Sequence, residues 1–166
     1  MAKDFSASFT VKQSPQEVFD AVTNVRGWWS EEIDGGTAKL YDEFYYHYRD
    51  VHECWIKLIE VVPNSRIVWL VKDNHFNFTK DEQEWKGTKV VFDITPQNSN
   101  TTLQFTHVGL VPEYECYEIC HEAWSNYIKH SLRNLIERGK GEPNPREGGF
   151  NGRIVEKWNL DKAKSA

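Results

Sequence analysis

The residues best suited to chemistry lie around position 115. Cys116 and Cys120 are four residues apart, so on a helix they share one face, and His107 and His121 are near them in the sequence. Thiolate and imidazole groups bind zinc, but the common zinc signatures pair cysteines two residues apart and carry two such pairs. The spacing favours two buried thiols acting as small apolar residues over a metal or redox role, so neither a metal ion nor a cofactor is predicted.

His107 is the histidine whose position is most informative. It follows Leu103 and Phe105 at even spacing, so in a strand its imidazole lies on their face. If that face is concave, the imidazole points into a cavity, where it recognises a ligand or transfers a proton. The alternative is a hydrogen-bonded histidine of the core. No second acid, base or nucleophile can be placed beside it from spacing, and therefore no catalytic residue is predicted.

Carboxylates offer weaker candidates for acid or base work. Glu43 and His47 alternate onto the face opposite the aromatic residues of their own segment, which indicates solvated strand surface, and Glu53 has the same simple interpretation. Glu84 and Trp85 either frame the mouth of a cavity or are exposed. No nucleophile elbow, phosphate loop or zinc-binding helix is present in the sequence.

A long helix is expected between Glu113 and Gly139. Its apolar residues recur at steps of three and four, which places them on one stripe: Ile119, Ala123, Trp124, Tyr127, Ile128, Leu132, Leu135 and Ile136. Gly139 provides a left-handed stop. A helix with so wide a stripe needs a large apolar surface to lie on, and the segments before it supply one.

Those segments predict a sheet. Phe5–Lys12 alternates apolar and polar residues, and Ser14 to Glu17 form a capping box for a short helix over Pro15–Thr23. Asn24–Glu31 is expected to be a second short helix. Further strands are predicted at Lys39–Arg49, His52–Val62, Arg66–Lys72, Thr88–Thr95 and Thr101–Val108, with a long connection over Asp73–Lys86. The order indicates an α+β fold with an antiparallel sheet.

Composition and charge narrow the class. The 166 residues fit one domain over 1–140, followed by a Gly- and Pro-rich extension over 141–166 that is expected to be partly ordered. The net charge is −5 with scattered charges, which argues against nucleic acid. No run of about 18 apolar residues is present to span a membrane, and the three cysteines fit a reducing compartment, so a cytoplasmic location is expected. Exposed strand edges and the apolar residues Phe150, Ile154 and Trp158 suggest a homodimer.

Several motifs together resemble a known family. They are Ser14-Pro15 through Val18-Phe19, Trp28-Trp29, Phe105 to Leu110, Glu115 to Tyr117, Cys120 ahead of Trp124, and Gly139 to Gly141. Over residues 5–140 the chain resembles the homologues of the activator of heat-shock protein 90 ATPase, within the START-like (SRPBCC, birch-allergen-like) superfamily. The resemblance implies a helix-grip fold, in which the sheet curls around the long helix and two short helices close a hydrophobic cavity. Members of the superfamily include lipid carriers, cyclases, hydrolase-like enzymes and co-chaperones.

The resemblance and the residues lead to three functional hypotheses. The first is binding of a small hydrophobic or amphipathic ligand, lipid-like or aromatic, between sheet and helix. The second is a cyclase- or hydrolase-like enzyme acting on such a ligand, with His107 or a tyrosine as proton donor, and the third is a chaperone-interacting module. The predicted lining is Trp28, Trp29, Phe44, Tyr46, Trp69, Phe92, Phe105, His107, Trp124, Tyr127 and Ile128.

Overall fold

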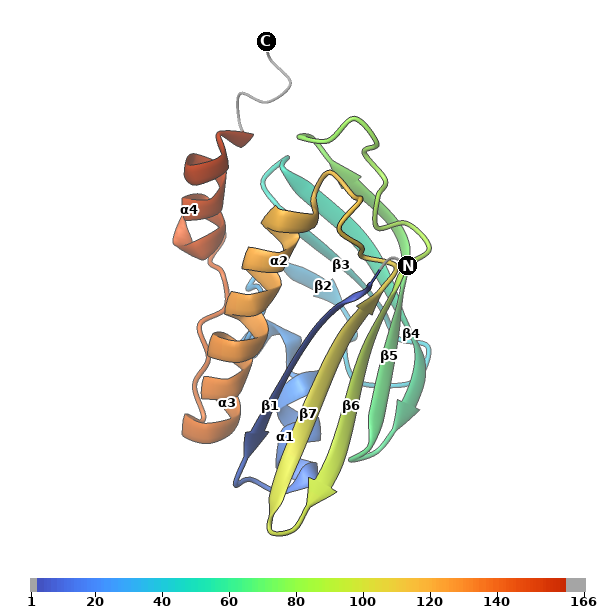
Figure 1. Cartoon of the computed structure of the whole chain (residues 1–166), viewed down its shortest axis with the longest axis vertical. Helices are drawn as coiled ribbons and strands as arrows, with labels where there is room; N and C mark the ends of the chain where they lie inside the picture. Colours follow the sequence, from blue (N-terminus) through green and yellow to red (C-terminus); the bar gives the residue numbers. More distant parts are fainter. Residues whose placement is uncertain (1–2, 161–166) are drawn as a thin grey trace.

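The computed structural model describes residues 3–160 and shows a curved antiparallel sheet with helices on its concave side (Figure 1). The seven strands are β1 (Phe5–Val11), β2 (Ile33–Gly35), β3 (Glu43–Tyr48), β4 (His52–Val62), β5 (Arg66–Phe76), β6 (Lys89–Gln97) and β7 (Asn100–Val108). They lie in the order β1-β7-β6-β5-β4-β3-β2. Residues 1–2 of the predicted domain and 161–166 of the predicted extension lie outside the described residues.

Most of the strands lie where the alternation of apolar and polar residues predicts them. Along β1 buried and exposed residues alternate without a break, and β4 has the predicted bounds. β5 continues to Phe76, beyond the predicted end at Lys72. The pairing with β4 shifts at Lys72, after which Asn74 and Phe76 are the buried positions, so the period of the first half does not predict the second. β2 was not predicted, since three residues are too few to show a period.

The first helix forms as its start signal predicts. α1 (Pro15–Thr23) is capped by Ser14, whose Oγ accepts a hydrogen bond from the Glu17 amide at 3.1 Å, while the Glu17 carboxylate accepts one from the Ser14 amide at 3.2 Å. Val18 and Val22 face the core. The second short helix is a single 3₁₀ turn, η1 (Val25–Gly27), which leads into the buried Trp28 and Trp29.

The long helix runs from Tyr117 to Arg138 in three parts: α2 (Tyr117–Ser125), the π-helical segment η2 (Asn126–Leu132) and α3 (Arg133–Arg138). It starts later than the predicted Glu113 because the preceding residues form turns, with the Tyr114 amide donating to the Val111 carbonyl. It ends at Gly139, where φ is 77° and a residue with a Cβ atom would be strained.

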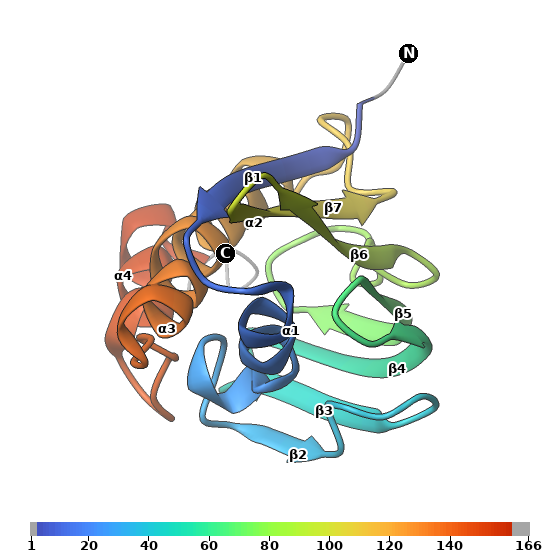
Figure 2. The ribbon, with the colours of Figure 1, turned by 90° about the horizontal axis from the view of Figure 1, so that it is seen from below.

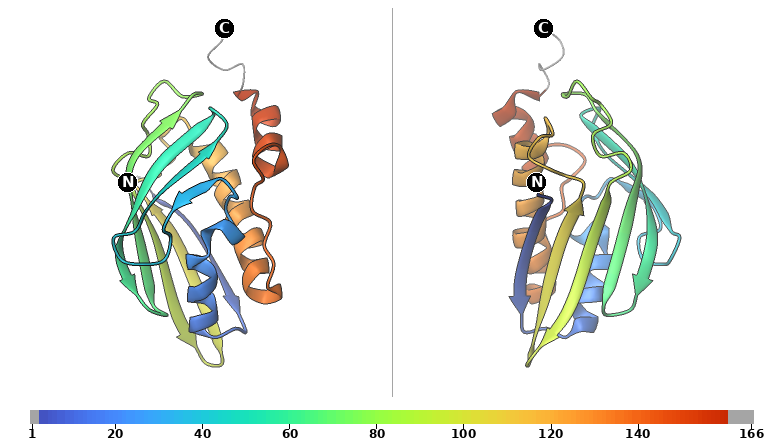
Figure 3. Two further views of the ribbon diagram at one scale, coloured as in Figure 1. Left: turned by 180° about the vertical axis from the view of Figure 1, so that it is seen from behind. Right: turned by 45° about the vertical axis from the view of Figure 1, so that its right-hand side comes forward.

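The sheet half encircles the helices (Figure 2). α1 lies across the lower end of its concave face, and the long helix crosses the open side, which is the helix-grip arrangement (Figure 3). A further helix, α4 (Gly149–Trp158), lies along the outside of the long helix and contacts α2. Within the described part of the chain, no helix combines the length and the apolarity that crossing a membrane requires.

Candidate ligand-binding cavity

A cavity lies in the upper half of the concave face, between the sheet, the long helix and α4. The centre of a water molecule can reach about 70 Å³ of it, which is room for several waters. The lower half of the concave face is solid, because α1 and a stack of core rings fill it: Trp28 and Trp69 are stacked at 6.2 Å between ring centroids. The site is therefore confined to one end of the fold.

Aromatic and aliphatic side chains from every layer make the walls. The sheet and the connections beside it contribute Trp29, Tyr46, Tyr48, Val51, His52 and Phe76, followed by Phe78 and Trp85. The long helix contributes Ile119, Cys120, Ala123, Trp124 and Tyr127. Among residues 3–160 none of the lining side chains is an Asp, Glu, Lys or Arg, so the described wall is uncharged. Such a surface favours apolar contents.

α4 forms the outer wall. Ile154 and Val155 are buried and line the cavity together with Leu160. Asn151 bridges the two sides of the fold: its Oδ1 accepts from the Tyr127 hydroxyl on the long helix at 2.7 Å, and its Nδ2 donates to the Tyr46 hydroxyl on β3 at 3.0 Å. One asparagine thus joins helix and sheet across the opening.

The segment that leads to α4 is held down as well. The Asn144 amide donates to the Trp29 carbonyl at 2.9 Å, and the Glu31 amide donates to the Asn144 carbonyl at 3.0 Å. The buried Asn144 Oδ1 accepts from the Asn151 amide at 2.8 Å, within the first turn of α4. The extension is therefore anchored by specific hydrogen bonds, and its apolar residues turn toward its own domain.

Two nitrogen atoms in the lining are unpaired. Within the described residues, Trp85 Nε1 and His52 Nε2 are buried and have no hydrogen-bond partner. Their rings are almost perpendicular, at 87°, with centroids 4.7 Å apart. Part of the His52 residue stays exposed although Nε2 is not, and burial lowers the pKa of its imidazole. A buried unpaired polar group costs about 1–3 kcal/mol, so two in one wall mark a place where a partner would be favourable.

His107 lies behind this wall and both of its ring nitrogens are engaged. Nδ1 accepts from Trp124 Nε1 at 3.1 Å, so Nε2 carries the proton and donates to Thr88 Oγ1 at 2.8 Å. The Thr88 hydroxyl in turn donates a hydrogen bond to the Trp85 carbonyl. Burial lowers the pKa of His107 to about 3. The geometry is that of a neutral histidine fixing the strand, the connection and the helix to one another.

The structure separates the residues predicted to line a site. Trp29, Tyr46, Trp124 and Tyr127 do line the cavity. The others are packed in the core outside it: Trp28, Phe44, Trp69, Phe92, Phe105, His107 and Ile128. Both groups lie on the concave side of the sheet. Residues at the upper end of that side contact the cavity, and residues farther down are packed in the core.

The remaining candidates for chemistry have structural partners. The Glu84 carboxylate accepts from the Glu115 and Cys116 amides at 2.8 and 3.0 Å, which caps the start of α2 with negative charge. The pKa of the Cys116 thiol is raised, mainly by a hydrogen bond with Cys120 and secondly by burial, so the thiol stays protonated. Within residues 3–160 no group of three or more His, Cys, Asp or Glu side chains is arranged to hold a metal ion.

Glu43 and His47 of β3 and Glu53 of β4 lie on the convex face. Glu43 forms an ion pair with Lys72 at 2.6 Å, and the hydrogen bond from this lysine lowers the pKa of the carboxyl. Glu53 accepts from the Tyr45 hydroxyl at 3.0 Å. These groups are on the far side of the sheet from the cavity, as the alternation of β3 predicted.

Sequence reasoning missed two groups of the site, His52 and the residues of α4, and left Trp85 between two alternatives. His52 shares the parity of Cys54, Ile56 and Leu58, a signal that could have placed it on the concave face. Trp85 was expected either at the mouth of a cavity or in an exposed position, because its segment has no period that decides between them, and the structure places it in the lining. The spacing of Ile154, Val155 and Trp158 is helical and could have predicted α4.

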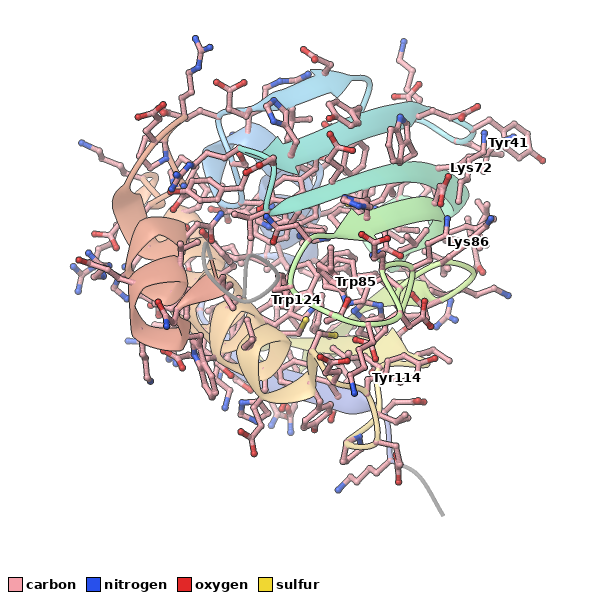
Figure 4. The ribbon with its side chains drawn as sticks, turned by 90° about the horizontal axis from the view of Figure 1, so that it is seen from above. Tyr41, Lys72, Trp85, Lys86, Tyr114 and Trp124 are labelled. Atoms are coloured by element: carbon pink, nitrogen blue, oxygen red, sulfur yellow. The ribbon has the colours of Figure 1, made fainter. Side chains whose placement is uncertain are left out.

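Figure 4 shows the cavity end of the molecule. Trp85 and Trp124 lie in the interior between the long helix and the sheet, and their rings are stacked at 5.7 Å. The labelled Tyr41, Lys72, Lys86 and Tyr114 lie toward the periphery. The indoles of the connection and of the helix therefore form one continuous apolar surface.

With this geometry in place, comparison with known proteins defines the class. The sequence model of the family described as "Activator of Hsp90 ATPase homolog 1-like protein" matches residues 12–137. The chain belongs to this family, and its fold is the helix-grip fold of the SRPBCC superfamily. Among curated proteins no match was found.

Solved structures share the fold at low sequence identity. The Aha1 dimer from Colwellia psychrerythraea is similar with a TM-score of 0.66 and 21% identity, over 84% of this chain and 99% of that one. DynU16, a putative protein in the dynemicin biosynthetic locus, is similar with a TM-score of 0.63 and 18% identity, over 85% of this chain and 49% of that one. CalU16 from Micromonospora echinospora is similar with a TM-score of 0.59 and 11% identity, over 99% of this chain and 90% of that one. At these identities the likeness concerns the fold.

Proposed function

We propose that the protein binds a small hydrophobic molecule in the cavity between the sheet, the long helix and α4. The observation that carries the proposal is the uncharged, mainly aromatic lining of that cavity. Burying apolar ligand surface there is favourable by roughly 25 cal/mol per Å². The family and fold are consistent with this function, because the helix-grip arrangement leaves one end of the concave face unfilled.

Binding without catalysis fits the polar groups of the lining. The hydroxyls of Tyr46 and Tyr127 are already hydrogen-bonded to Asn151, and burial raises the pKa of both. His52 is held neutral by burial and is not paired with an acid among the described residues. Proton transfer needs a donor and an acceptor poised near the operating pH. For this reason we favour a binding protein over a cyclase- or hydrolase-like enzyme, and no contact in the structure singles out a chaperone-interacting role.

We propose that α4 is the part of the wall that moves when a ligand enters. Its anchors are separate side-chain contacts: the bridging Asn151, the buried Ile154 and Val155, the Phe150 ring against Tyr127 at 5.8 Å, and hydrogen bonds from Lys157 and Trp158 to Glu122. The sheet and long helix, by contrast, are held by continuous ladders and the aromatic core. Local opening of α4, which has no ladder hydrogen bonds to the sheet, would widen the access to the cavity.

We further propose a cytoplasmic location and a homodimer. All three cysteines lie in the described residues and are free and buried, which is in keeping with a reducing compartment. The apolar residues Ile154 and Val155 pack on their own domain, so the support for a dimer reduces to the edge strands β1 and β2 and to the dimeric state of the similar Colwellia protein. Light scattering at tens of micromolar protein tests this, and a monomer would contradict it.

Native mass spectrometry of freshly purified protein tests the proposed function. We expect the wild type to carry a hydrophobic molecule, and Ala123→Phe to release it, because Ala123 lines the cavity and the larger ring would fill it. Ala38→Phe is the matched control, since Ala38 is exposed and outside the cavity. Retention in both variants would place the ligand elsewhere and overturn the proposal. So would a wild type that carries no molecule and binds no added hydrophobic probe.

A further inference from the structure

Resting on the proposed function, we infer the chemical class of the ligand: an uncharged ring-containing molecule with one hydrogen-bonding oxygen, such as a phenol, an alcohol or a ketone. Trp85 and His52 hold that oxygen. The inference follows from which polar atoms around the cavity are engaged and which are unpaired.

The ligand is neutral because the described wall offers no counter-charge. Within residues 3–160 the lining contains no acidic or basic side chain other than His52, and that imidazole is neutral. An ionised carboxylate or amine would lose its hydration on entering and gain no ion pair. Fatty acids and amines in their charged forms are thereby disfavoured.

The oxygen is required by the indole N–H of Trp85, which is buried and has no acceptor among the described residues. Trp124 also lines the cavity, but its N–H donates to His107 at 3.1 Å. The hydroxyls of Tyr46 and Tyr127 are bonded to Asn151. The Tyr48 hydroxyl is bonded to Gly148. The buried polar atoms of the lining that have no partner are the Trp85 N–H, which can only donate, and Nε2 of His52, whose ring contacts the Trp85 ring. A ligand oxygen satisfies the first, and a hydroxyl satisfies both.

Entry of the ligand is coupled to pairing of these nitrogens. Neither atom has exposed surface, so a ligand reaches them only after the lining shifts. A shift that exposes two unpaired polar atoms to a partner regains hydrogen bonds that the closed state lacks. A shift of the lining should therefore be more favourable with a ligand that carries an oxygen than with one that carries none.

Three single-ring probes separate these contributions: toluene and phenol, which match in size and differ in polarity, and the somewhat larger benzoate, which carries a charge. Their dissociation constants are measured by calorimetry at neutral pH with the wild type, Trp85→Phe and His52→Phe. The readout is the ratio of the phenol constant to the toluene constant, because a change in cavity shape affects both probes alike. We expect this ratio to rise roughly three- to tenfold in Trp85→Phe, as for one lost hydrogen bond, and to rise in His52→Phe as well. Benzoate should bind more weakly than either.

Trp124→Phe is the matched control, since it removes an indole from the same wall whose N–H is already paired within the protein. It should weaken both probes by the same factor and leave the ratio unchanged. Toluene binding shows for each variant that the cavity is intact. An unchanged ratio in both Trp85→Phe and His52→Phe, or tight benzoate binding, would overturn this inference while leaving the proposed function standing. Failure of all three probes to bind the wild type would contradict the proposed function itself.

Discussion

Replacing Asn151 by alanine should loosen α4 without unfolding the domain. The substitution removes two side-chain hydrogen bonds, from the Tyr127 hydroxyl at 2.7 Å and to the Tyr46 hydroxyl at 3.0 Å. At about 1 kcal/mol net for each bond, the free energy of opening α4 falls by about 2 kcal/mol. That corresponds to a rise of roughly 30-fold in the population in which α4 is detached.

Amide hydrogen exchange followed by mass spectrometry measures this population directly. Peptides that cover residues 149–158 should exchange on the order of 30 times faster in Asn151→Ala, while peptides from β6 and β7 keep their wild-type rates. Lys157→Ala is the matched control on the same helix. It removes an ion pair whose lysine side chain is 61% exposed, which is worth roughly 0.2–1 kcal/mol, so it should speed exchange less than about fivefold.

The same variant links α4 to ligand entry. If binding requires α4 to open first, the association rate of phenol or toluene should rise with the open population in Asn151→Ala and change little in Lys157→Ala. Exchange that accelerates equally in the sheet would mean that Asn151 stabilises the whole domain. Faster exchange in α4 with no change in association rate would mean that the ligand enters by another route. Either result would refute the assignment of α4 as the movable wall.

Two further predictions concern buried titratable groups. Because the unfolded His107 takes up a proton near its ordinary pKa of 6.5 and the folded one only near 3, stability should fall as the pH drops between these values, by up to about 1.4 kcal/mol per pH unit from this residue. Urea unfolding of His107→Leu should show a lower stability at pH 7.5, by about 2–4 kcal/mol, with a shallower fall toward acid, and an unchanged pH slope would contradict the burial argument. The three buried cysteines should resist a thiol reagent at pH 8 until the protein is unfolded in urea, and fast labelling of the native protein would show that a thiol is accessible.

The sheet and the long helix could be predicted because each carries its own period. Phe44, Tyr46 and Tyr48 are all buried on β3, as their alternation predicts, and Trp124, Tyr127, Ile128, Leu132 and Ile136 are buried along the helix, as the steps of three and four predict. The helix-grip topology then follows from burying one stripe against one concave face. The π-helical turn at Asn126–Leu132 could not be predicted, since its sequence keeps the ordinary helical pattern.

The cavity could be predicted only in part because a period gives the face of a residue and not its depth. His107 and His52 both face the concave side of the sheet, yet the first is sealed behind Trp85 and the second meets the cavity. What separates them is the connection between β5 and β6, which has no repeating pattern and folds inward through Trp85. Its position is fixed by long-range contacts, such as the hydrogen bond from the Trp85 amide to Asn74 Oδ1 at 3.0 Å.

α4 lies outside the region that matches the family, whereas most of the cavity wall lies inside it. The family match ends at residue 137, whereas Asn151, Ile154 and Val155 lie beyond it and form the outer wall. The matched region supplies strands β2 to β7, nearly all of the long helix and the two unpaired nitrogens, which together determine the kind of molecule that fits. The extension determines how much space is left, because its side chains occupy the opening between Tyr46 and Tyr127. Polarity and size of the ligand are therefore controlled by different segments, so substitutions in α4 should change the size of the ligand accepted while substitutions at Trp85 change its chemistry.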